Sequence, residues 1–347
     1  MPEFGNRGSF RRIRILRKGM VVLMTRALGL EPISPRHRDL QKAQAAGAVS
    51  LPEYAWQFQS EMPVIKWDAA FDAWLDRRIA LADKYAAAGY SLRPWDVFRV
   101  LPDKAKRSDI FAWDQGAIPS CSMHGAAHAY QCMTLTSIAL GAPLYYEAFN
   151  PIYPFYAARG GNLAGGLDLY TVAEWVNEKG MTPVSLVGDD NLRVARAQLD
   201  KMNEGVKWQA GIVLLEDDFD ERIRRACRAL CSVCFGAGHF YSRSKIDRRG
   251  VRVMDGRAYG GHAQAFTAWM EIDGEEYVYN LNSHGDIYRA GNGEPENGAW
   301  IGTAALGRYA SDMEMYGLPF IPFAEGEFRR DSALVNDFEL PRAAESA

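Results

Sequence analysis

The chain has 347 residues, of which 48% are hydrophobic and 24% are charged, and this is the balance of an ordinary globular protein. Its length allows one large domain or two smaller ones. The net charge of −3 gives no support for a nucleic-acid partner or for an anionic membrane surface as a partner.

The chain begins with a basic cluster made of Arg11, Arg12, Arg14, Arg17 and Lys18. The apolar run behind it, Met20 to Met24, is too short for a secretory core or a membrane span. We therefore expect no membrane span, and we expect residues 1–35 to form a flexible or partner-dependent arm.

Helical spacing is the main signal in the first half of the chain. Between residues 50 and 105, apolar residues recur at helical spacing until Gly89 or Pro94 breaks the pattern. A second helix is predicted from Cys121 to about Leu140, followed by a loop rich in Pro and Tyr (Pro143, Pro151 and Pro154). After the Gly-rich turn at residues 160–166, a third helix is predicted from Asp168 to Gly180.

Strand patterns dominate after residue 205. One more helix is predicted from Asp217 to Leu230, and strands are predicted at residues 232–235, 263–271 and 276–281. The last two strands are joined across Asp273 and Gly274, a pair typical of a hairpin turn. Helices first and strands second predict an α+β fold with a cleft between the layers.

The segment from Gln115 to Cys121 holds a glutamine, a turn rich in Gly and Pro, and a cysteine six residues after the glutamine. Because Cys121 is predicted to begin a helix, its sulfur would lie at the positive end of the helix dipole, which favours the thiolate. The Gln115 side chain is placed to donate its amide hydrogens to a developing oxyanion. This segment is typical of a thiol enzyme.

Two later segments supply a base and a group to orient it. His262 lies 141 residues after Cys121, and Asn282 lies 20 residues after His262. Asp273, in the predicted hairpin turn, is the second choice for the orienting group. A Cys–His pair oriented by a third polar side chain is the arrangement of a nucleophilic thiol hydrolase.

The order and spacing of these residues resemble those of papain-like cysteine peptidases, from about Trp113 to about Ala310. The segment from Gln115 to Cys121 resembles the family's Gln–Gly segment that leads into the nucleophile. Residues 165–166 (Gly165 and Gly166) resemble its substrate-binding Gly–Gly, and residues 261–263 (Gly261, His262 and Ala263) resemble the strand that carries the base. Residues 282–285 (Asn282 to Gly285) resemble its Asn-Ser-Trp-Gly.

The resemblance implies a two-lobed papain-like α+β fold. Residues 1–105 would form an N-terminal arm and helical extension, 106–205 a helical lobe with Cys121, and 206–347 a β-rich lobe with His262 and Asn282. We expect the extension to be an integral part of the protein, with a removable prosegment as the alternative, and a protein partner for it is a further expectation.

The resemblance also implies the roles of single residues. Cys121 would be the nucleophile in a thiolate–imidazolium pair with His262, and Asn282 would hold the imidazole in its useful tautomer. Gln115 and the backbone N–H of Cys121 would form the oxyanion hole. The substrate would be bound by Gly165, Gly166, Gly261 and His284.

The implied reaction is hydrolysis of a peptide or isopeptide bond through a thioester, with a peptide or protein as the substrate and no metal or organic cofactor. Two other functions remain open. One is a different thiol hydrolase, such as a cell-wall amidase or endopeptidase or a transglutaminase-like enzyme. The other is a non-catalytic papain-fold component that binds a partner inside a larger assembly.

The chain departs from the family pattern at three positions. Ile118 stands where a cysteine is usual, Ser122 replaces the aromatic residue after the nucleophile, and His284 replaces the Trp of Asn-Ser-Trp-Gly. A polar residue in place of this Trp predicts wetter surroundings for the hydrogen bond between His262 and Asn282.

The five cysteines are an odd number, which does not indicate a disulfide framework, so we expect a reducing compartment such as the cytoplasm. Cys227, Cys231 and Cys234 have the spacing of an iron–sulfur site, but we expect the first two on a helix and all three packed as small hydrophobic residues. Cys121, His124, His128 and Cys132 cannot all bind one metal ion, because eleven helical residues rise about 16 Å and at most two adjacent members could share an ion. We expect His124 and His128 to be core or cleft residues.

Overall fold

The computed structural model describes residues 64–101, 111, 113–140, 146, 148–182, 184, 210–213, 218–240, 244–246, 252–254, 258–285, 293–304, 306 and 317–322. The predicted arm at residues 1–35 lies outside them. Within the described part, the helices are α2 (Ala69–Ala87), α3 (Pro94–Val100), α4 (Cys121–Ala139), α5 (Ile152–Ala158), α6 (Leu169–Lys179) and α9 (Phe219–Arg228). No described helix is long and apolar enough to cross a membrane.

The described strands form one sheet in the order β1-β2-β9-β3-β6-β7-β8-β5-β4. Their bounds are β1 (Val64–Ile65), β2 (Ala210–Val213), β3 (Ser232–Phe240), β4 (Ser244–Ile246), β5 (Arg252–Met254), β6 (Ala258–Ile272), β7 (Glu275–Leu281), β8 (Gly298–Gly302) and β9 (Gly317–Pro322). Helices packed on a largely antiparallel sheet make the fold α+β, as predicted. The division into lobes at residues 105 and 205 stays a prediction.

The long hairpin of β6 and β7 forms the middle of the sheet. Ala265 pairs with Leu281, and Ile272 pairs with Glu275, across the turn at Asp273 and Gly274. Both turn residues have positive φ, 54° and 76°, as the two-residue turns of a hairpin require. The hairpin that the sequence predicts at Asp273-Gly274 is confirmed.

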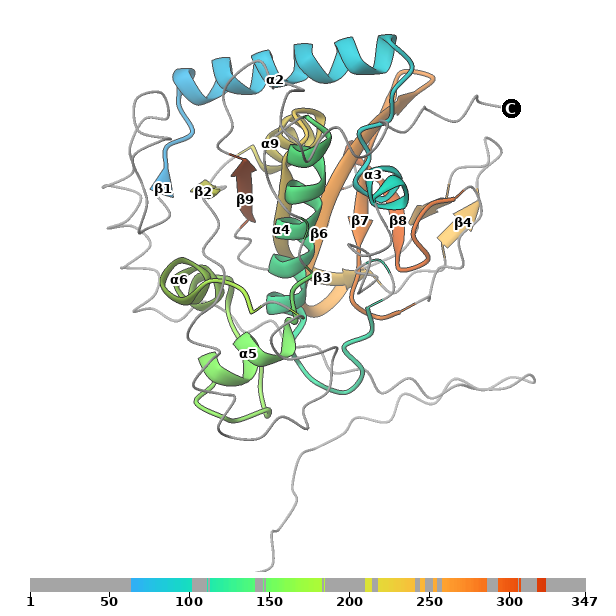
Figure 1. Ribbon diagram of the computed structural model, residues 1–347. Coiled ribbons are helices and arrows are strands. Elements are labelled where there is room, and N and C mark those ends of the chain that lie inside the picture. Colours follow the sequence, from blue (N-terminus) through green and yellow to red (C-terminus); the bar gives the residue numbers. More distant parts are fainter. Residues whose placement is uncertain are drawn as a thin grey trace, which may run out of the picture.

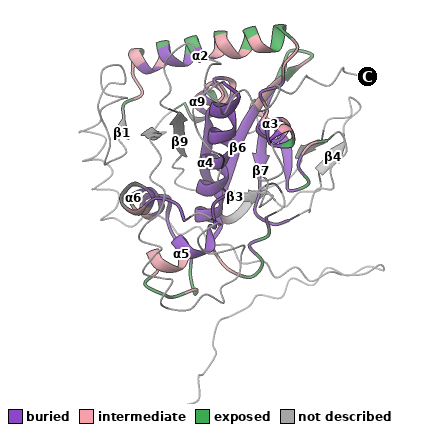
Figure 2. Cartoon of the chain, in the orientation of Figure 1, coloured by how far each residue is buried: buried purple, intermediate pink, exposed green. Residues whose placement is uncertain are grey.

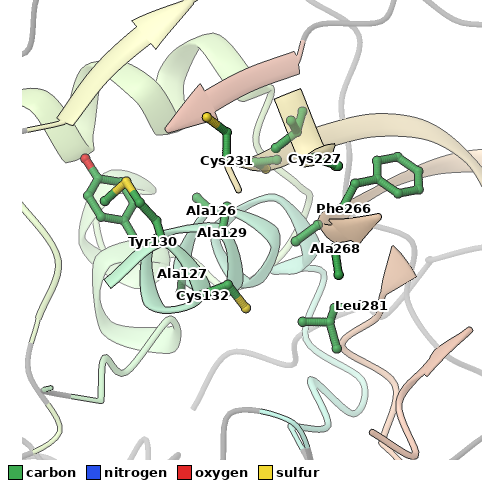
Figure 3. Packing of buried hydrophobic residues seen from close by; sticks show 14 of the residues in the cluster. Ala126, Ala127, Ala129, Tyr130, Cys132, Cys227, Cys231, Phe266, Ala268 and Leu281 are labelled. Atoms are coloured by element: carbon green, nitrogen blue, oxygen red, sulfur yellow. The ribbon is translucent and has the colours of Figure 1, made fainter. Parts of the chain in front are cut away.

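Helix α4 is the central helix of the molecule, and all nineteen of its residues are buried (Figure 2). Small side chains allow this position: Ala126, Ala127 and Ala129 lie in the core together with Phe266 of β6 (Figure 3). A Cβ at Gly125 would lie 3.2 Å from the backbone nitrogen and the carbonyl oxygen of Gln264. The missing side chain at position 125 therefore lets the cysteine-bearing helix lie directly on strand β6.

Helix α2 belongs to the same packed core. Phe71, Trp74 and Leu75 are buried in it, at the helical spacing that the sequence shows. On the side facing α9, the Arg225 guanidinium donates to Asp72 and to Asp76, at 2.6 Å each. Figure 1 shows α2 along the top of the molecule and the start of α4, which carries Cys121, at the lower end.

Two details of the predicted elements are wrong. The Pro- and Tyr-rich loop contains a helix, α5, because Pro154 occupies its first turn, where a missing N–H costs nothing. Cys231 does not lie on a helix: α9 ends at Arg228, and Leu230 takes a positive φ of 62° that turns the chain toward β3.

Candidate active site

Cys121 is the first residue of α4. Its sulfur accepts a hydrogen bond from the backbone N–H of Ala263, at 3.4 Å. The thiol therefore lies beside the residue that follows His262, at the end of the helix where the backbone dipole favours negative charge. The structure thus brings together two residues that are 141 positions apart in the sequence.

A hydrogen bond of 3.0 Å joins Nε2 of His262, on β6, to Oδ1 of Asn282, directly after β7. The backbone N–H of Ser283 also donates to this oxygen, at 2.7 Å, which fixes the orientation of the amide. Because Oδ1 can only accept, the histidine carries its proton on Nε2. Its Nδ1 then holds a lone pair, which is the tautomer that a base for a thiol requires.

The ring of His284 packs on the ring of His262. If the pairing of Ala265 with Leu281 is continued by three residues, His262 comes level with His284. Their centroids are 4.7 Å apart with 31° between the planes, and both side chains are fully buried. The prediction of wetter surroundings for the hydrogen bond between His262 and Asn282 is therefore wrong, because the buried ring of His284 covers His262 as an aromatic side chain would.

Burial sets the charge of His262. It lowers the pKa of His262 to about 4, and the hydrogen bond with Asn282 raises this pKa only in part. The imidazole is neutral at pH 7 in this conformation. A neutral imidazole is a base for the thiol and not the positive partner of the thiolate–imidazolium pair that the resemblance implies.

Gln115 lies on a segment that pairs with the residues after Asn282. Its backbone N–H donates to the Ser283 carbonyl at 2.8 Å, and the N–H of Gly285 donates to the Trp113 carbonyl at 2.9 Å. In the side chain of Gln115, Oε1 accepts from Ser283 Oγ, and Nε2 donates to the Ile118 carbonyl at 2.9 Å. One network therefore positions both the glutamine and the asparagine.

Asn297 is a supporting residue that the sequence analysis missed. The backbone N–H of Asn282 donates to the Asn297 carbonyl at 2.9 Å, and Nδ2 of Asn297 donates to the Asn282 carbonyl at 2.8 Å. These bonds tie the peptide groups on both sides of Asn282 to the start of β8. Fifteen residues separate the two asparagines, and no motif in the sequence marks Asn297.

The predicted substrate-binding glycines lie in two places. Gly165 and Gly166 are in a turn between α5 and α6, where Gly165 is exposed with a φ of 81° and Gly166 is buried. The guanidinium of Arg159 donates to the Gly166 carbonyl at 2.8 Å and also to the Ala164 carbonyl, so it holds this turn in place. Gly261 lies on β6, paired with β3.

The other candidate residues from the sequence, Asp273 and the three clustered cysteines, lie away from the pairing of Cys121 with His262. Asp273 is exposed at the tip of the hairpin, and ten residues of strand, about 33 Å, separate it from His262. Cys227, Cys231 and Cys234 are buried in the hydrophobic core (Figure 3 shows the first two). In the described part of the chain, no group of three or more His, Cys, Asp or Glu side chains is placed to hold a metal ion.

A pocket of about 580 Å³ lies between the ends of α2 and α9, helix α3 and strand β6, with Tyr90, Arg93 and Trp269 in its lining. On β6 its lining begins at Thr267, five residues beyond His262, which is about 16 Å along the strand. None of the predicted site residues lines it. No sequence motif pointed to this pocket.

No family model and no curated protein matches the sequence. Among solved structures, the chain is similar to papain-like cysteine proteases. With procathepsin B S9 from Trypanosoma congolense it shares 12% identity and a TM-score of 0.48, over 84% of this chain and 86% of that one.

Two further structures are similar to the chain. Xylellain, a cysteine protease from Xylella fastidiosa, shares 13% identity and a TM-score of 0.42, over 65% of this chain and 88% of that one. Procathepsin L 3 from the larval midgut of Tenebrio molitor shares 12% identity and a TM-score of 0.43, over 82% of this chain and 99% of that one. The roles of single residues depend on the geometry of the site and not on these likenesses.

Proposed function

We propose that the chain is a thiol hydrolase that cleaves a peptide or isopeptide bond through a thioester on Cys121. One observation carries the proposal: Cys121, His262 and Asn282 lie together. The Cys121 sulfur is 3.4 Å from the backbone nitrogen of Ala263, the residue after His262, and Nε2 of His262 is 3.0 Å from Oδ1 of Asn282. A nucleophile, a base and a group that orients the base are the three parts of a catalytic triad.

In the proposed reaction, Nδ1 of His262 accepts the thiol proton as the Cys121 sulfur attacks the substrate carbonyl. The carbonyl π electrons move onto oxygen, and their return expels the amine, which takes the proton from His262. The result is a thioester on Cys121. Water then attacks the thioester carbonyl while His262 takes a proton from the water. The C–S bond breaks, the carboxylic acid leaves, and the Cys121 sulfur takes the proton back from His262.

The oxyanion would be stabilised by two donors. The first is the backbone N–H of Cys121, because the first N–H groups of a helix have no acceptor within the helix. The second is Nε2 of Gln115, an amide nitrogen with two hydrogens, whose position is fixed by Ser283 and Ile118. Each such donor contributes about 100-fold or more to kcat in enzymes of this type.

An extended peptide would lie along the turn at Gly165 and Gly166, where no side chain blocks pairing with the enzyme's backbone. Gly165 is exposed in this turn, and Arg159 holds the carbonyl of the buried Gly166. Gly261 and the ring of His284 would form the other side of the substrate site.

A non-catalytic binding role is the second candidate, and the burial of the site favours it. Cys121, His262, Asn282 and His284 are fully buried, and Gln115 is 2% exposed. A hydrolase with this site must open before a substrate carbonyl reaches the sulfur.

Mass spectrometry of substrate mixtures tests the proposed function. The purified protein is incubated with a peptide library, with isopeptide-linked peptides and, separately, with peptidoglycan fragments. We expect cleavage that Cys121→Ala abolishes, while Cys132→Ala, which changes another buried cysteine of α4, retains it. Cleavage of peptidoglycan fragments alone would identify a cell-wall amidase or endopeptidase. Equal products from Cys121→Ala would contradict a thioester mechanism.

A further inference from the structure

His124, one helical turn after Cys121, makes an unusual contact with the residue before the nucleophile. Its backbone N–H donates to the Ser120 carbonyl at 3.0 Å, as helix geometry requires. Its ring nitrogen Nδ1 lies 3.1 Å from the same carbonyl oxygen and 3.1 Å from Ser120 Oγ. The Ser120 carbonyl thus faces two nitrogens of a single residue.

The surroundings of His124 decide which ring nitrogen carries the proton. The Ser120 carbonyl oxygen can only accept, and a bare Nδ1 would set its lone pair against this oxygen, so the contact favours the hydrogen on Nδ1. The Ser120 hydroxyl can donate or accept and therefore fits either tautomer. Nε2 is buried and has no hydrogen-bond partner among the residues that the structure describes, which agrees with a bare nitrogen. Burial lowers the pKa of His124 to about 3, so the imidazole is neutral at pH 7.

The indole of Trp113 holds the His124 ring in this orientation. The two rings meet edge to face, with centroids 5.8 Å apart and 89° between the planes. Trp113 is itself stacked on His128, at 4.7 Å, and its carbonyl accepts from Gly285. The bond from His124 to Ser120 is therefore built into the same packed network as Gln115.

The Ser120 carbonyl matters because it belongs to the same planar peptide unit as the N–H of Cys121. A donor that fixes the carbonyl end of this unit also fixes the direction of its N–H. Two hydrogen bonds to the oxygen further polarise the unit and strengthen its N–H as a donor. The Ser120 side chain makes no capping bond to a backbone N–H of α4, and its Oγ lies against Nδ1 of His124 instead.

From this geometry we infer that His124 is a positioning residue for the oxyanion hole: its Nδ1–H aims and polarises the Ser120–Cys121 peptide so that the Cys121 N–H meets the oxyanion. The inference rests on the proposed function. It gives His124 a role that is separate from proton transfer, because His124 acts on a backbone group and does not exchange a proton with the thiol.

Helix α4 itself supplies the design of a rescue experiment. Thr134 Oγ1 donates to the Tyr130 carbonyl at 2.9 Å, and Thr136 Oγ1 donates to the Cys132 carbonyl at 3.0 Å. A threonine in this helix therefore bonds the carbonyl four residues before it. His124→Thr would restore a donor to the Ser120 carbonyl, whereas His124→Val has nearly the same shape and no hydroxyl.

Two rates separate the inference from its alternatives. The first is kcat for a substrate identified in the cleavage experiment proposed above, and the second is the rate of Cys121 alkylation by iodoacetamide, a reaction that forms no oxyanion. We expect His124→Val to lower kcat about 10- to 100-fold, because one donor of the oxyanion hole is misdirected. Its KM and its alkylation rate should stay within about 3-fold of the wild type, and His124→Thr should recover most of kcat. Thermal unfolding of both variants controls for a loss of fold.

Equal kcat values for the Val and Thr variants would overturn the inference while leaving the proposed function intact. An equal fall of kcat and of the alkylation rate in His124→Val would also overturn it, since the defect would then lie in the thiol or its base. A wild-type protein that cleaves no substrate would instead overturn the proposed function, and the inference with it.

Discussion

Acidification from pH 7 to pH 4 is expected to lower the free energy of unfolding by about 3–6 kcal/mol through two buried histidines alone. Burial lowers the pKa of His262 to about 4 and that of His124 to about 3, from the ordinary value of 6.5. Below pH 6.5 these two histidines bind protons in the unfolded chain but stay neutral in the folded protein, so acid favours unfolding. Above pH 6.5 the two histidines take nothing from the free energy of unfolding. Below pH 6.5 the loss of stability grows until the pH reaches their folded-state pKa values.

Urea unfolding of the wild type and of His124→Phe at several pH values between 4 and 8 measures the contribution of His124. Phenylalanine keeps an aromatic ring against Trp113 and does not titrate. The variant should lose less stability on acidification, by up to about 1.4 kcal/mol per pH unit below pH 6.5. Parallel curves for the two proteins would show that His124 titrates normally and is not buried as described.

Gly298→Ala is expected to destabilise the protein by about 3–5 kcal/mol, a large effect for one methyl group. A Cβ at this position would lie 2.3 Å from Cε1 of Tyr279 and 2.7 Å from the Asn280 carbonyl oxygen. The Tyr279 ring cannot move away, because it packs against Trp95 and Trp300, with centroids 4.5 Å and 4.9 Å away. Strand β8 must then separate from β7.

We also expect Gly298→Ala to shift Asn282 in the candidate active site. The residue before Gly298 is Asn297, which makes hydrogen bonds to the backbone N–H and the carbonyl of Asn282. Gly302→Ala, in the same strand, is the matched control: its nearest contact would be Tyr277 at 3.8 Å, an ordinary van der Waals distance. Thermal denaturation should show a much lower Tm for Gly298→Ala and a nearly unchanged Tm for Gly302→Ala. Similar Tm values for both variants would contradict the described packing of β7 and β8.

The parts of the fold with strong local signals could be predicted from the sequence. Asp168 caps α6 at its start and Gly180 ends it, and the pair at Asp273-Gly274 makes the hairpin turn, as local patterns indicate. Helix α5 could not be predicted in the same way, because a segment rich in Pro and Tyr indicates a loop, although a helix accepts proline in its first turn.

The site could be predicted only in outline. Spacing and motif singled out Cys121, His262 and Asn282, but nothing local indicates that Ser283 Oγ donates to Gln115, because 168 residues separate the two. The contact of His124 with Ser120 is local, yet four residues of helix do not reveal which way a buried ring turns. That orientation is set by Trp113, through tertiary packing.

Burial also could not be read from the motif. The pattern Asn-Ser-His-Gly suggested an open, polar surrounding for His262, whereas the structure buries His262 and His284 completely. The exposure of a side chain depends on which segments cover it. This burial changes the expected resting charge of His262 from an imidazolium to a neutral imidazole.

The most direct test of the pairing of Cys121 with His262 is the rate at which each cysteine is alkylated by iodoacetamide at pH 7, followed by mass spectrometry in the wild type and in His262→Ala. All five cysteines are free and buried, so exposure alone gives Cys121 no advantage. We expect Cys121 to react at least about 100-fold faster than the other four, and to lose that advantage in His262→Ala. A Cys121 that reacts no faster than its neighbours, or equally fast without the imidazole, would contradict the pairing.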